Sequence, residues 1–227
     1  MNIAIIPARS GSKRIKNKNI KLFNNKPIIS YVIKTCIESG IFSKIFVSTD
    51  SKKIANISKK YGAEILLREN KKLSNDFTPV TQVIKYDIKK IKKITAEQNY
   101  YCCILPTSPL LKPIDLKKSF KTFKTKKNSI LFSVNKFSYP IQRSFYLKKD
   151  GHIEMYNKRN FFKRSQDLKS SFHDAGQFYW GKEKHWNKNN FFSNNCFPYL
   201  LNKFYVQDID DYDDWKYCEF LFKYNLK

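Results

Sequence analysis

The sequence lacks any long apolar run. Its first residues carry neither a basic stretch nor an extended apolar segment, and no later segment approaches the roughly 18 apolar residues that a membrane span needs. We therefore expect neither secretion nor membrane insertion, and we expect a cytoplasmic location.

Cysteine and histidine are scarce. The five cysteines are odd in number and scattered, which favours reduced thiols over a disulfide framework. His152 and His185 have no partners at metal-binding spacing. His173 and Asp174 are adjacent, but no serine or cysteine stands in a recognisable nucleophile motif, so covalent catalysis is not indicated.

Acidic residues are few: 19 Asp and Glu stand against 44 Lys and Arg, a formal net charge of +25. Basic runs at 13–18 and 89–93 could attract phosphate groups. Lysine is nevertheless spread along the whole chain, and no recognised nucleic-acid-binding motif accompanies it. A basic nucleic-acid-binding protein is therefore an alternative that we do not favour.

Short apolar runs alternate with segments of helical periodicity in the first half of the chain. The expected strands are 3–6, 45–48, 63–67 and 101–105, and the expected helices are 28–39, 51–61 and 79–93. This order predicts an α/β fold with a doubly wound, mostly parallel sheet that carries helices on both faces.

The second half is less regular. From 137 to 172 the alternation is replaced by aromatic and charged residues, which predicts a small inserted lobe for substrate or dimer contacts. The core pattern resumes at 177–180 and 203–206, and a last helix is expected at 213–224. Since no repeat or low-complexity linker divides the chain, residues 1–227 are expected to form one domain.

Loops begin at Pro7, Thr49, Arg68 and Pro106, where four predicted strands end. In parallel sheets, ligands bind at this edge. The first loop, 7–19, combines small residues whose amides can face a phosphate with several cations, but it lacks the spacing of a Walker loop or a dinucleotide fingerprint. The loop indicates triphosphate binding; a solvated basic loop is the alternative that its residues leave open.

The same loop carries a family resemblance. Its segments 6–14 and 18–20 resemble the signature loop of the CMP-nonulosonate cytidylyltransferases, the CMP-sialic acid synthetase-like enzymes. Further matches follow in the family's order at Val47-Ser48-Thr49-Asp50, Leu67-Arg68, Leu73-Ser74-Asn75-Asp76, Leu105-Pro106-Thr107-Ser108-Pro109-Leu110 and Asp208-Ile209-Asp210. The matches span almost the whole chain.

The resemblance implies a Rossmann-like nucleotidyltransferase that transfers CMP from CTP to an acidic nine-carbon sugar and releases pyrophosphate. It also implies a homodimer and Mg²⁺ as cofactor. The implied nucleotide-binding residues are Ala8, Arg9, Ser10, Gly11, Ser12, Lys18, Asn19, Arg68 and Asp76. The implied catalytic residues are Arg9, Lys18, Asp208 and Asp210, with the two aspartates as the metal ligands.

The two aspartates suit a metal by their spacing. Asp208 and Asp210 flank Ile209, so both carboxylates face one side if the segment is extended, as a hard cation requires. The alternative is that these acids cap the helix that follows, a role that suits Asp211 and its neighbours better.

Segments of the second half are similar to those of pseudaminic acid cytidylyltransferases. They are 138–143, 164–168 and 172–180. The sugar-binding residues that this similarity implies are Arg143, Arg164, Gln166, Asp174 and Gln177, each of which could instead make a surface ion pair or a polar rim contact.

The resemblance makes pseudaminic acid the preferred sugar, with N-acetylneuraminic (sialic) or legionaminic acid as the alternative. Many sialic acid synthetases have glutamine where this chain has Leu105, which argues against sialic acid. A degenerate relative without catalysis is a further alternative, but the presence of Arg9, Lys18, Asp208 and Asp210 argues against it.

Overall fold

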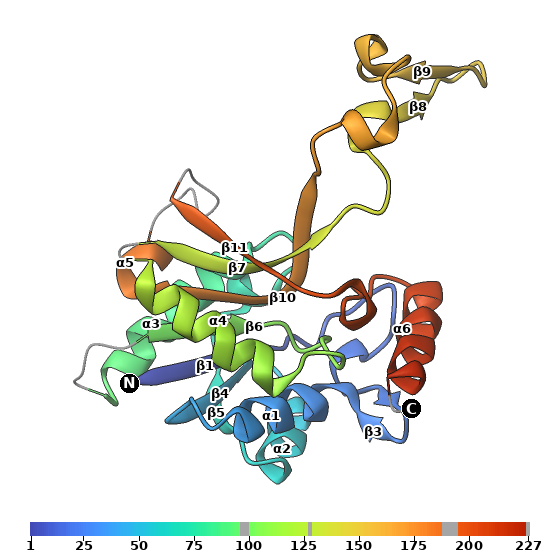
Figure 1. The fold of residues 1–227 in the computed structure, drawn as a ribbon. Coiled ribbons are helices and arrows are strands. Elements are labelled where there is room, and N and C mark those ends of the chain that lie inside the picture. The colour runs from blue at the N-terminus through green and yellow to red at the C-terminus, as the bar shows by residue number, and fades with distance from the viewer. Residues whose placement is uncertain (96–99, 127–128, 188–194, 226–227) are drawn as a thin grey trace.

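A seven-stranded sheet forms the centre of the computed structural model, which describes residues 1–95, 100–126, 129–187 and 195–225 (Figure 1). The strands stand in the order β11-β7-β10-β6-β1-β4-β5. In chain order they are β1 (Asn2–Pro7), β4 (Lys44–Thr49), β5 (Glu64–Leu67), β6 (Tyr100–Ile104), β7 (Ile130–Lys136), β10 (Phe172–Lys182) and β11 (Cys196–Leu200). Only β10 runs antiparallel to its neighbours. The prediction of a mostly parallel α/β sheet is confirmed.

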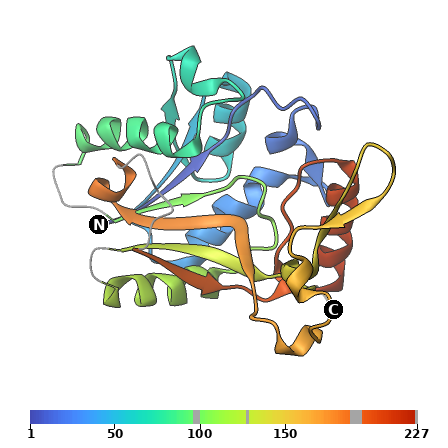
Figure 2. The same ribbon diagram turned by 90° about the horizontal axis from the view of Figure 1, so that it is seen from above.

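Helices cover both faces of the sheet, as Figure 2 shows from above. One face packs against α1 (Ile28–Ser39), α2 (Lys52–Lys60) and α4 (Pro113–Thr125), and the other against α3 (Val80–Lys92) and α5 (Glu183–Trp186). Strand β1 shows why the central strands are apolar throughout. Ala4 and Ile6 belong to the first core and Ile3 and Ile5 to the second, because successive side chains point to opposite faces.

The core also accounts for the cysteines. Cys36, Cys102, Cys103 and Cys218 are buried thiols whose pKa is raised by burial, so they act as apolar packing groups. Within the described ranges, no helix combines the length and apolar character that crossing a membrane would require.

Several elements of the second half went unpredicted, among them α4, β7 and β11. Helix α4 carries basic residues on most of its surface and buries few side chains, among them Leu116 and Phe123, so its apolar pattern is weak. The expectation that 203–206 belongs to the core is wrong for Lys203 and Phe204, which are exposed because Asn202 caps a 3₁₀ turn at Lys203–Tyr205. Tyr205 is half-buried against an apolar cluster, and Val206 is buried.

An arm of residues 137–171 leaves the sheet between β7 and β10 and projects away from it (Figure 1). It contains a two-stranded hairpin, β8 (Phe145–Leu147) and β9 (Ile153–Met155), together with three short 3₁₀ turns. Large apolar side chains on this arm are exposed, including Leu147 at 73% and Phe162 at 92%. The arm therefore presents apolar surface that the chain itself does not cover.

A third apolar cluster joins the two ends of the chain. Helix α6 (Tyr212–Tyr224) packs Trp215, Cys218 and Leu221 against Ile15 and Phe23 of the first loop region. Ile209 lies in the same cluster and is fully buried. This packing places the segment that precedes α6 beside the first loop (Figure 1).

Candidate active site

A pocket of about 570 Å³ opens at the carboxyl ends of β1, β5 and β6. Its lining includes Pro7, Arg68 and Pro106, so three of the four predicted rim loops reach it. Thr49, where the fourth loop begins, is fully buried and outside the lining. The structure thus has a charged pocket at the edge of the sheet where the sequence predicts the site.

The lining holds five cationic side chains and three carboxylates. The cations are Arg9, Lys13, Arg14, Lys18 and Arg68, and the acids are Asp76, Asp208 and Asp210. Apolar side chains of Leu73, Val80, Val83 and Leu105 line it as well. A pocket with excess positive charge and an apolar wall suits a ligand that has both an anionic and a flat apolar part.

The first loop is held in shape by its own contacts. Ile15 is buried, and Asn17 adopts a left-handed conformation (φ 55°) that starts the 3₁₀ turn Lys18–Ile20. The side chain of Asn19 donates to the carbonyl oxygen of Arg9 at 2.9 Å. Asn19 therefore fixes the backbone from which the Arg9 side chain projects.

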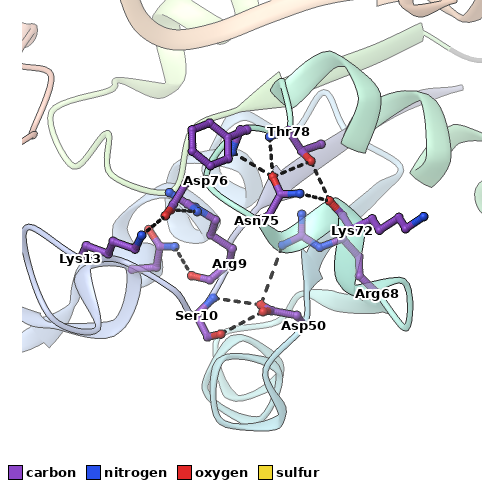
Figure 3. A network of polar contacts seen from close by, with 11 residues as sticks. Arg9, Ser10, Lys13, Asp50, Arg68, Lys72, Asn75, Asp76 and Thr78 are labelled. Carbon is purple, nitrogen blue, oxygen red and sulfur yellow. Dashed lines mark hydrogen bonds and ion pairs between the residues drawn. The ribbon is translucent and has the colours of Figure 1, made fainter.

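Two cations of the first loop meet one acid from across the pocket, as Figure 3 shows. Arg9 donates to Asp76, and the Lys13 ammonium lies 2.7 Å from the same carboxylate. These hydrogen bonds, from Lys13 and then Arg9, lower the pKa of Asp76. An anionic ligand that displaced Asp76 would find two cations already directed at its place.

The turn that carries Asp76 is built on Asn75. Its Oδ1 accepts hydrogen bonds from the backbone amides of Phe77 and Thr78 at 2.9 and 2.8 Å, and its Nδ2 donates to the carbonyl oxygen of Lys72. Such a turn fixes the chain direction just before α3 begins at Val80. Asp76 is thereby held on a rigid turn at the pocket mouth (Figure 3).

Six of the predicted nucleotide-binding residues line the pocket, and three do not. Arg9, Ser12, Lys18, Asn19, Arg68 and Asp76 are in the lining. Ala8 is fully buried, and Gly11 faces open space. Ser10 turns its amide and hydroxyl to the Asp50 carboxylate, both at 2.9 Å, and so braces the loop. A direct nucleotide contact stays a prediction for all nine.

Lys18 spans the pocket to the C-terminal part of the chain. Its ammonium donates to the carbonyl oxygen of Ile209 at 2.5 Å. Burial lowers the pKa of Lys18, and the charges of Asp210 and Asp208 oppose that shift. The cation thus lies among the two carboxylates that the sequence assigns to a metal.

The capping alternative for Asp208 and Asp210 fails in this structure. Asp211 caps α6 by accepting from the amides of Asp213 and Asp214, and Asp214 accepts from the amide of Asp210 at 2.9 Å. The carboxylates of Asp208 and Asp210 lie in the pocket lining instead. The segment has no strand assignment, yet both acids flank the buried Ile209 as the spacing predicts.

The pair Asp208 and Asp210 fits a hard divalent cation. Protein surrounding Asp208 raises its pKa by desolvation, and the charge of Asp210 raises it further, so the two carboxylates repel each other. Arg14 pairs with Asp210 at 2.7 Å. Gly176, in a left-handed conformation, leaves room beside Asp208, where a Cβ would lie 3.6 Å from the carboxylate.

Such a cation would need further ligands from outside the protein. Among the described residues, no group of three or more His, Cys, Asp or Glu side chains is arranged to hold a metal ion. Two carboxylates completed by phosphate oxygens and water are the usual coordination of Mg²⁺. The donor set therefore fits Mg²⁺ bound together with a phosphorylated ligand.

None of the five predicted sugar-binding residues lies in the lining of this pocket. Arg143, Arg164 and Gln166 belong to the arm, where Arg164 pairs with Asp167 at 2.8 Å. Gln177 is buried and donates to the carbonyl oxygen of Tyr205. The sugar-binding role of these residues stays a prediction.

Among the predicted sugar-binding residues, Asp174 is the one whose charge acts on Asp208. It sits at a bulge of β10, where it accepts from the Gly176 amide at 2.9 Å and from the Tyr179 hydroxyl at 2.6 Å. Its charge contributes to the raised pKa of Asp208. The bulge thus places one rigidly held carboxylate on the Asp208 side of the pocket.

Several residues of the site were missed by sequence reasoning. Arg14, Asp50, Asn75 and Asp87 had been given no role, although two of them carry readable signals. Asn75 begins the segment Asn-Asp-Phe-Thr-Pro, a pattern typical of a turn before a helix. Asp87 interrupts the apolar face of a predicted helix, and an acidic side chain is rarely buried on such a face unless it is paired.

Asp87 of α3 is fully buried behind the pocket. Burial raises its pKa to about 7, while the Ser48 hydroxyl and the charges of Arg68 and Lys90 oppose the shift. Arg68 is buried as well, and burial lowers its pKa against the opposing charges of Asp87 and Asp50. A buried acid and a buried cation thus favour each other's charged form below the pocket.

Comparison with known proteins places this chain among nucleotide-transferring enzymes. A family model described as cytidylyltransferase matches residues 3–222. A pseudaminic acid cytidylyltransferase of Campylobacter jejuni is 38% identical over 99% of this chain and 97% of that protein. An N-acylneuraminate cytidylyltransferase of Escherichia coli is 29% identical over 94% of this chain and 50% of that protein.

The fold has solved counterparts at low sequence identity. The structure of CMP:2-keto-3-deoxy-manno-octonic acid synthetase complexed with CTP superposes with a TM-score of 0.69 over 99% of both chains, at 13% identity. At that identity the likeness concerns the fold alone. It confirms the predicted Rossmann-like fold.

The buried carboxylate of Asp87 predicts a pH-dependent stability. Its pKa is about 7 in the folded chain against 3.8 unfolded, so between about pH 4 and pH 7 the folded state binds more protons. Stability should therefore fall as pH rises through this window, by an amount on the order of 4 kcal/mol if the whole shift is expressed. Urea unfolding of the wild type and Asp87→Asn at several pH values measures it. The variant should lose this part of the slope, and two parallel curves would contradict the prediction.

Proposed function

The chain belongs to the cytidylyltransferase family, and on that premise we propose that it transfers CMP from CTP to pseudaminic acid, giving CMP-pseudaminic acid and pyrophosphate. One observation carries the proposal for this chain. The pocket gathers the cations of the first loop and the carboxylates of Asp208 and Asp210 at the edge of the sheet where family members are expected to bind CTP.

The charges of the pocket support a triphosphate as ligand. Arg9 and Lys13 both pair with Asp76, and Arg14 pairs with Asp210. Each of these three cations therefore has a carboxylate partner that a phosphate can replace. A phosphate oxygen accepts the same charge-assisted hydrogen bonds from arginine. In the proposed complex these side chains turn from Asp76 and Asp210 to the phosphates of CTP.

In the proposed reaction the anomeric hydroxyl of the sugar acid attacks the α-phosphorus of CTP in line. The new bond joins the sugar oxygen to the α-phosphorus, the bond to the β-phosphate oxygen breaks, and the hydroxyl proton is lost. Lys18 and Arg9 hold positive charge where negative charge grows on the transferring phosphoryl group. Asn19 keeps Arg9 in place, so rate derives from fixed charge and position.

Asp208 and Asp210 are the residues that would hold Mg²⁺ in the proposed complex. When bound, Mg²⁺ neutralises charge on the phosphates of the nucleotide and the leaving pyrophosphate. The chain contributes two carboxylates fixed around the buried Ile209, and the Lys18 ammonium that reaches the backbone between them. These contacts orient the acids before any ligand arrives.

Pseudaminic acid is the sugar that the similarities favour. The similar Campylobacter jejuni enzyme covers nearly the whole chain at higher identity than the Escherichia coli N-acylneuraminate enzyme. Asp174, held by two donors beside the Asp208 side of the pocket, is the carboxylate best placed to accept hydrogen bonds from a sugar substituent. Legionaminic and N-acetylneuraminic acids remain alternatives with the same reaction.

The arm supports the proposal of a homodimer. Its exposed apolar side chains, with Tyr139, Leu147, Tyr156 and Phe162 all more than 70% exposed, form a surface that soluble monomers rarely leave open. A second copy that covers this surface could also bring Arg143 or Arg164 to its partner's pocket. We further propose that the enzyme acts in the cytoplasm, which agrees with its buried, unreactive thiols.

The first test is pyrophosphate release from CTP and Mg²⁺ with pseudaminic, legionaminic and N-acetylneuraminic acids offered separately. Release is expected with pseudaminic acid, because the second-half segments and the similar enzymes favour it. Release with only one of the other two acids would change the proposed sugar substrate and leave the proposed reaction in place. If none of the three acids gives pyrophosphate release, the proposed function is contradicted. The nucleic-acid-binding alternative would then be favoured, and it predicts a polynucleotide affinity that falls steeply as the salt concentration rises.

The metal role is tested by Asp210→Asn. Loss of one of two charged ligands should lower kcat by roughly a hundredfold or more, since charge stabilisation is a large part of phosphoryl transfer. Asp213→Asn is the matched control, because that side chain is 95% exposed in the first turn of α6. Equal activity of both variants would remove the proposed role of Asp210.

The dimer is tested on the arm with Leu147→Lys combined with Phe162→Lys. Two charges on the apolar surface should separate the copies, so sedimentation should show a dimer for the wild type and a monomer for the variant. Phe220→Lys is the control, because Phe220 is 62% exposed on α6, outside the arm. A monomeric wild type at micromolar concentration would contradict the proposal.

A further inference from the structure

The guanidinium of Arg68 lies in the floor of the pocket without normal hydrogen-bond partners. Its side chain is 2% exposed, and among the described residues neither Nε nor Nη2 makes a hydrogen bond. Nη2 lies 4.0 Å from Asp50 Oδ1, which is too far for a direct bond. A buried cation with unpaired N–H groups is costly, so something else must hold it there.

The inner face of α3 brings an acid to the same place. Val80 and Val83 line the pocket, and Asp87 lies one helical turn after Val83 on that face. Its side chain is fully buried, and neither carboxylate oxygen makes a hydrogen bond of normal geometry with a described residue. Asp87 thus resembles Arg68: it is a buried ionisable group without a hydrogen bond of normal geometry to a described residue.

The strands direct Arg68 towards α3. Phe46 of β4 and Leu66 of β5 pack in the core that includes Ile84 and Ile88 of α3. Because side chains alternate along a strand, Ser48 and Arg68 point to the same side two residues later. The amide of Arg68 continues the pairing with the carbonyl oxygen of Thr49 at 2.8 Å, which keeps this direction.

The electrostatics agree with this placement. The charge of Asp87 is the largest influence that favours the charged form of Arg68, ahead of Asp50. In return, Arg68 favours the carboxylate form of Asp87 against burial. The two groups therefore interact across the interface between α3 and the sheet, behind the apolar wall that Val80 and Val83 provide.

We propose that Asp87 is a positioning residue for the nucleotide base: its buried carboxylate holds the Arg68 guanidinium in the pocket floor, so that the edge of the guanidinium that lines the pocket faces the ligand. The proposal rests on the proposed function. A pyrimidine base between the apolar side chains would offer ring acceptors to the N–H groups on that edge, because a guanidinium presents its donors in a fixed plane.

Asp87→Asn tests the proposal because it keeps the shape and removes the charge. The Kd of CTP, measured by calorimetry without sugar, should rise about tenfold, as expected when a buried charged contact loses its orientation. In turnover the KM for CTP should rise by the same factor, while kcat and the KM for the sugar stay near the wild-type values. A purely structural role would not divide the parameters in this way.

Asp115→Asn is the matched control. Asp115 is a half-buried acid of α4 that accepts from the Tyr199 hydroxyl at 3.1 Å, and it is absent from the pocket lining. This variant removes a partly buried carboxylate elsewhere in the fold. Its CTP affinity should match that of the wild type, and a tenfold loss here too would overturn the proposal.

A second comparison isolates the action through Arg68. With Arg68→Gln as background, adding Asp87→Asn should change CTP affinity less than twofold, because the group it positions is gone. If the single Asp87→Asn variant does not fold, Arg68→Gln and the double variant are compared alone, and a tenfold loss on adding Asp87→Asn to Arg68→Gln would overturn the proposal. An equal tenfold loss in both backgrounds would overturn the proposal.

The outcomes separate this proposal from the proposed function. If the wild type binds and turns over CTP while Asp87→Asn has wild-type CTP affinity, the positioning role is overturned and the reaction stands. If the wild type does not bind CTP, the proposed function and the positioning role are both overturned.

Discussion

The active-site pocket depends on one packing contact, the burial of Ile15 and Ile209 in the apolar cluster beneath α6. Ile15 belongs to the loop that carries the phosphate-seeking cations, and Ile209 separates the two acids assigned to the metal. Because both side chains are buried in one cluster, residues nearly 200 positions apart face each other at fixed positions. The hydrogen bond from Lys18 to the backbone of Ile209 then joins the two segments directly.

Three cations near this contact are paired with acids that an anionic ligand can replace. Arg9 and Lys13 are held by Asp76, and Arg14 by Asp210, at the mouth of the pocket where the acids are partly exposed. Exposed ion pairs are weak, so a phosphate can replace such a carboxylate at little cost. Arg68 differs because it is buried and has no such exchangeable partner, which is why a second buried charge behind it matters.

Much of this site could be predicted from the sequence because its motifs lie on regular strands and tight loops. The run Ile3 to Ile6 is apolar on both faces, which only a central strand requires. The family resemblance implied Arg9, Lys18, Arg68 and Asp76, and all four lie in the lining of the pocket. Both acids that flank Ile209 line the pocket as well, although the segment forms no strand.

The rest depends on contacts that no local pattern records. Helix α4 packs against Trp180 and strand β11 pairs with β7, and the lysines of α4 weaken its apolar pattern. Phe204 resembles a core residue but stacks on Tyr224 at the surface. The bulge at Gly176 redirects β10 beside Asp208. The direction of the Gln177 side chain, towards a ligand or towards the backbone of Tyr205, depends on this bulge.

The large positive charge of the chain has a limited role in ligand binding. Among the described residues, five basic side chains line the pocket, and many others lie on exposed surfaces of helices and of the arm. A field of this sign attracts CTP and an acidic sugar alike, and it acts on the encounter rather than on the chemical step. Selection between ligands must therefore come from the short-range contacts of the pocket, where Asp76 holds Arg9 and Lys13, Asp210 holds Arg14, and the backbone of Ile209 holds Lys18.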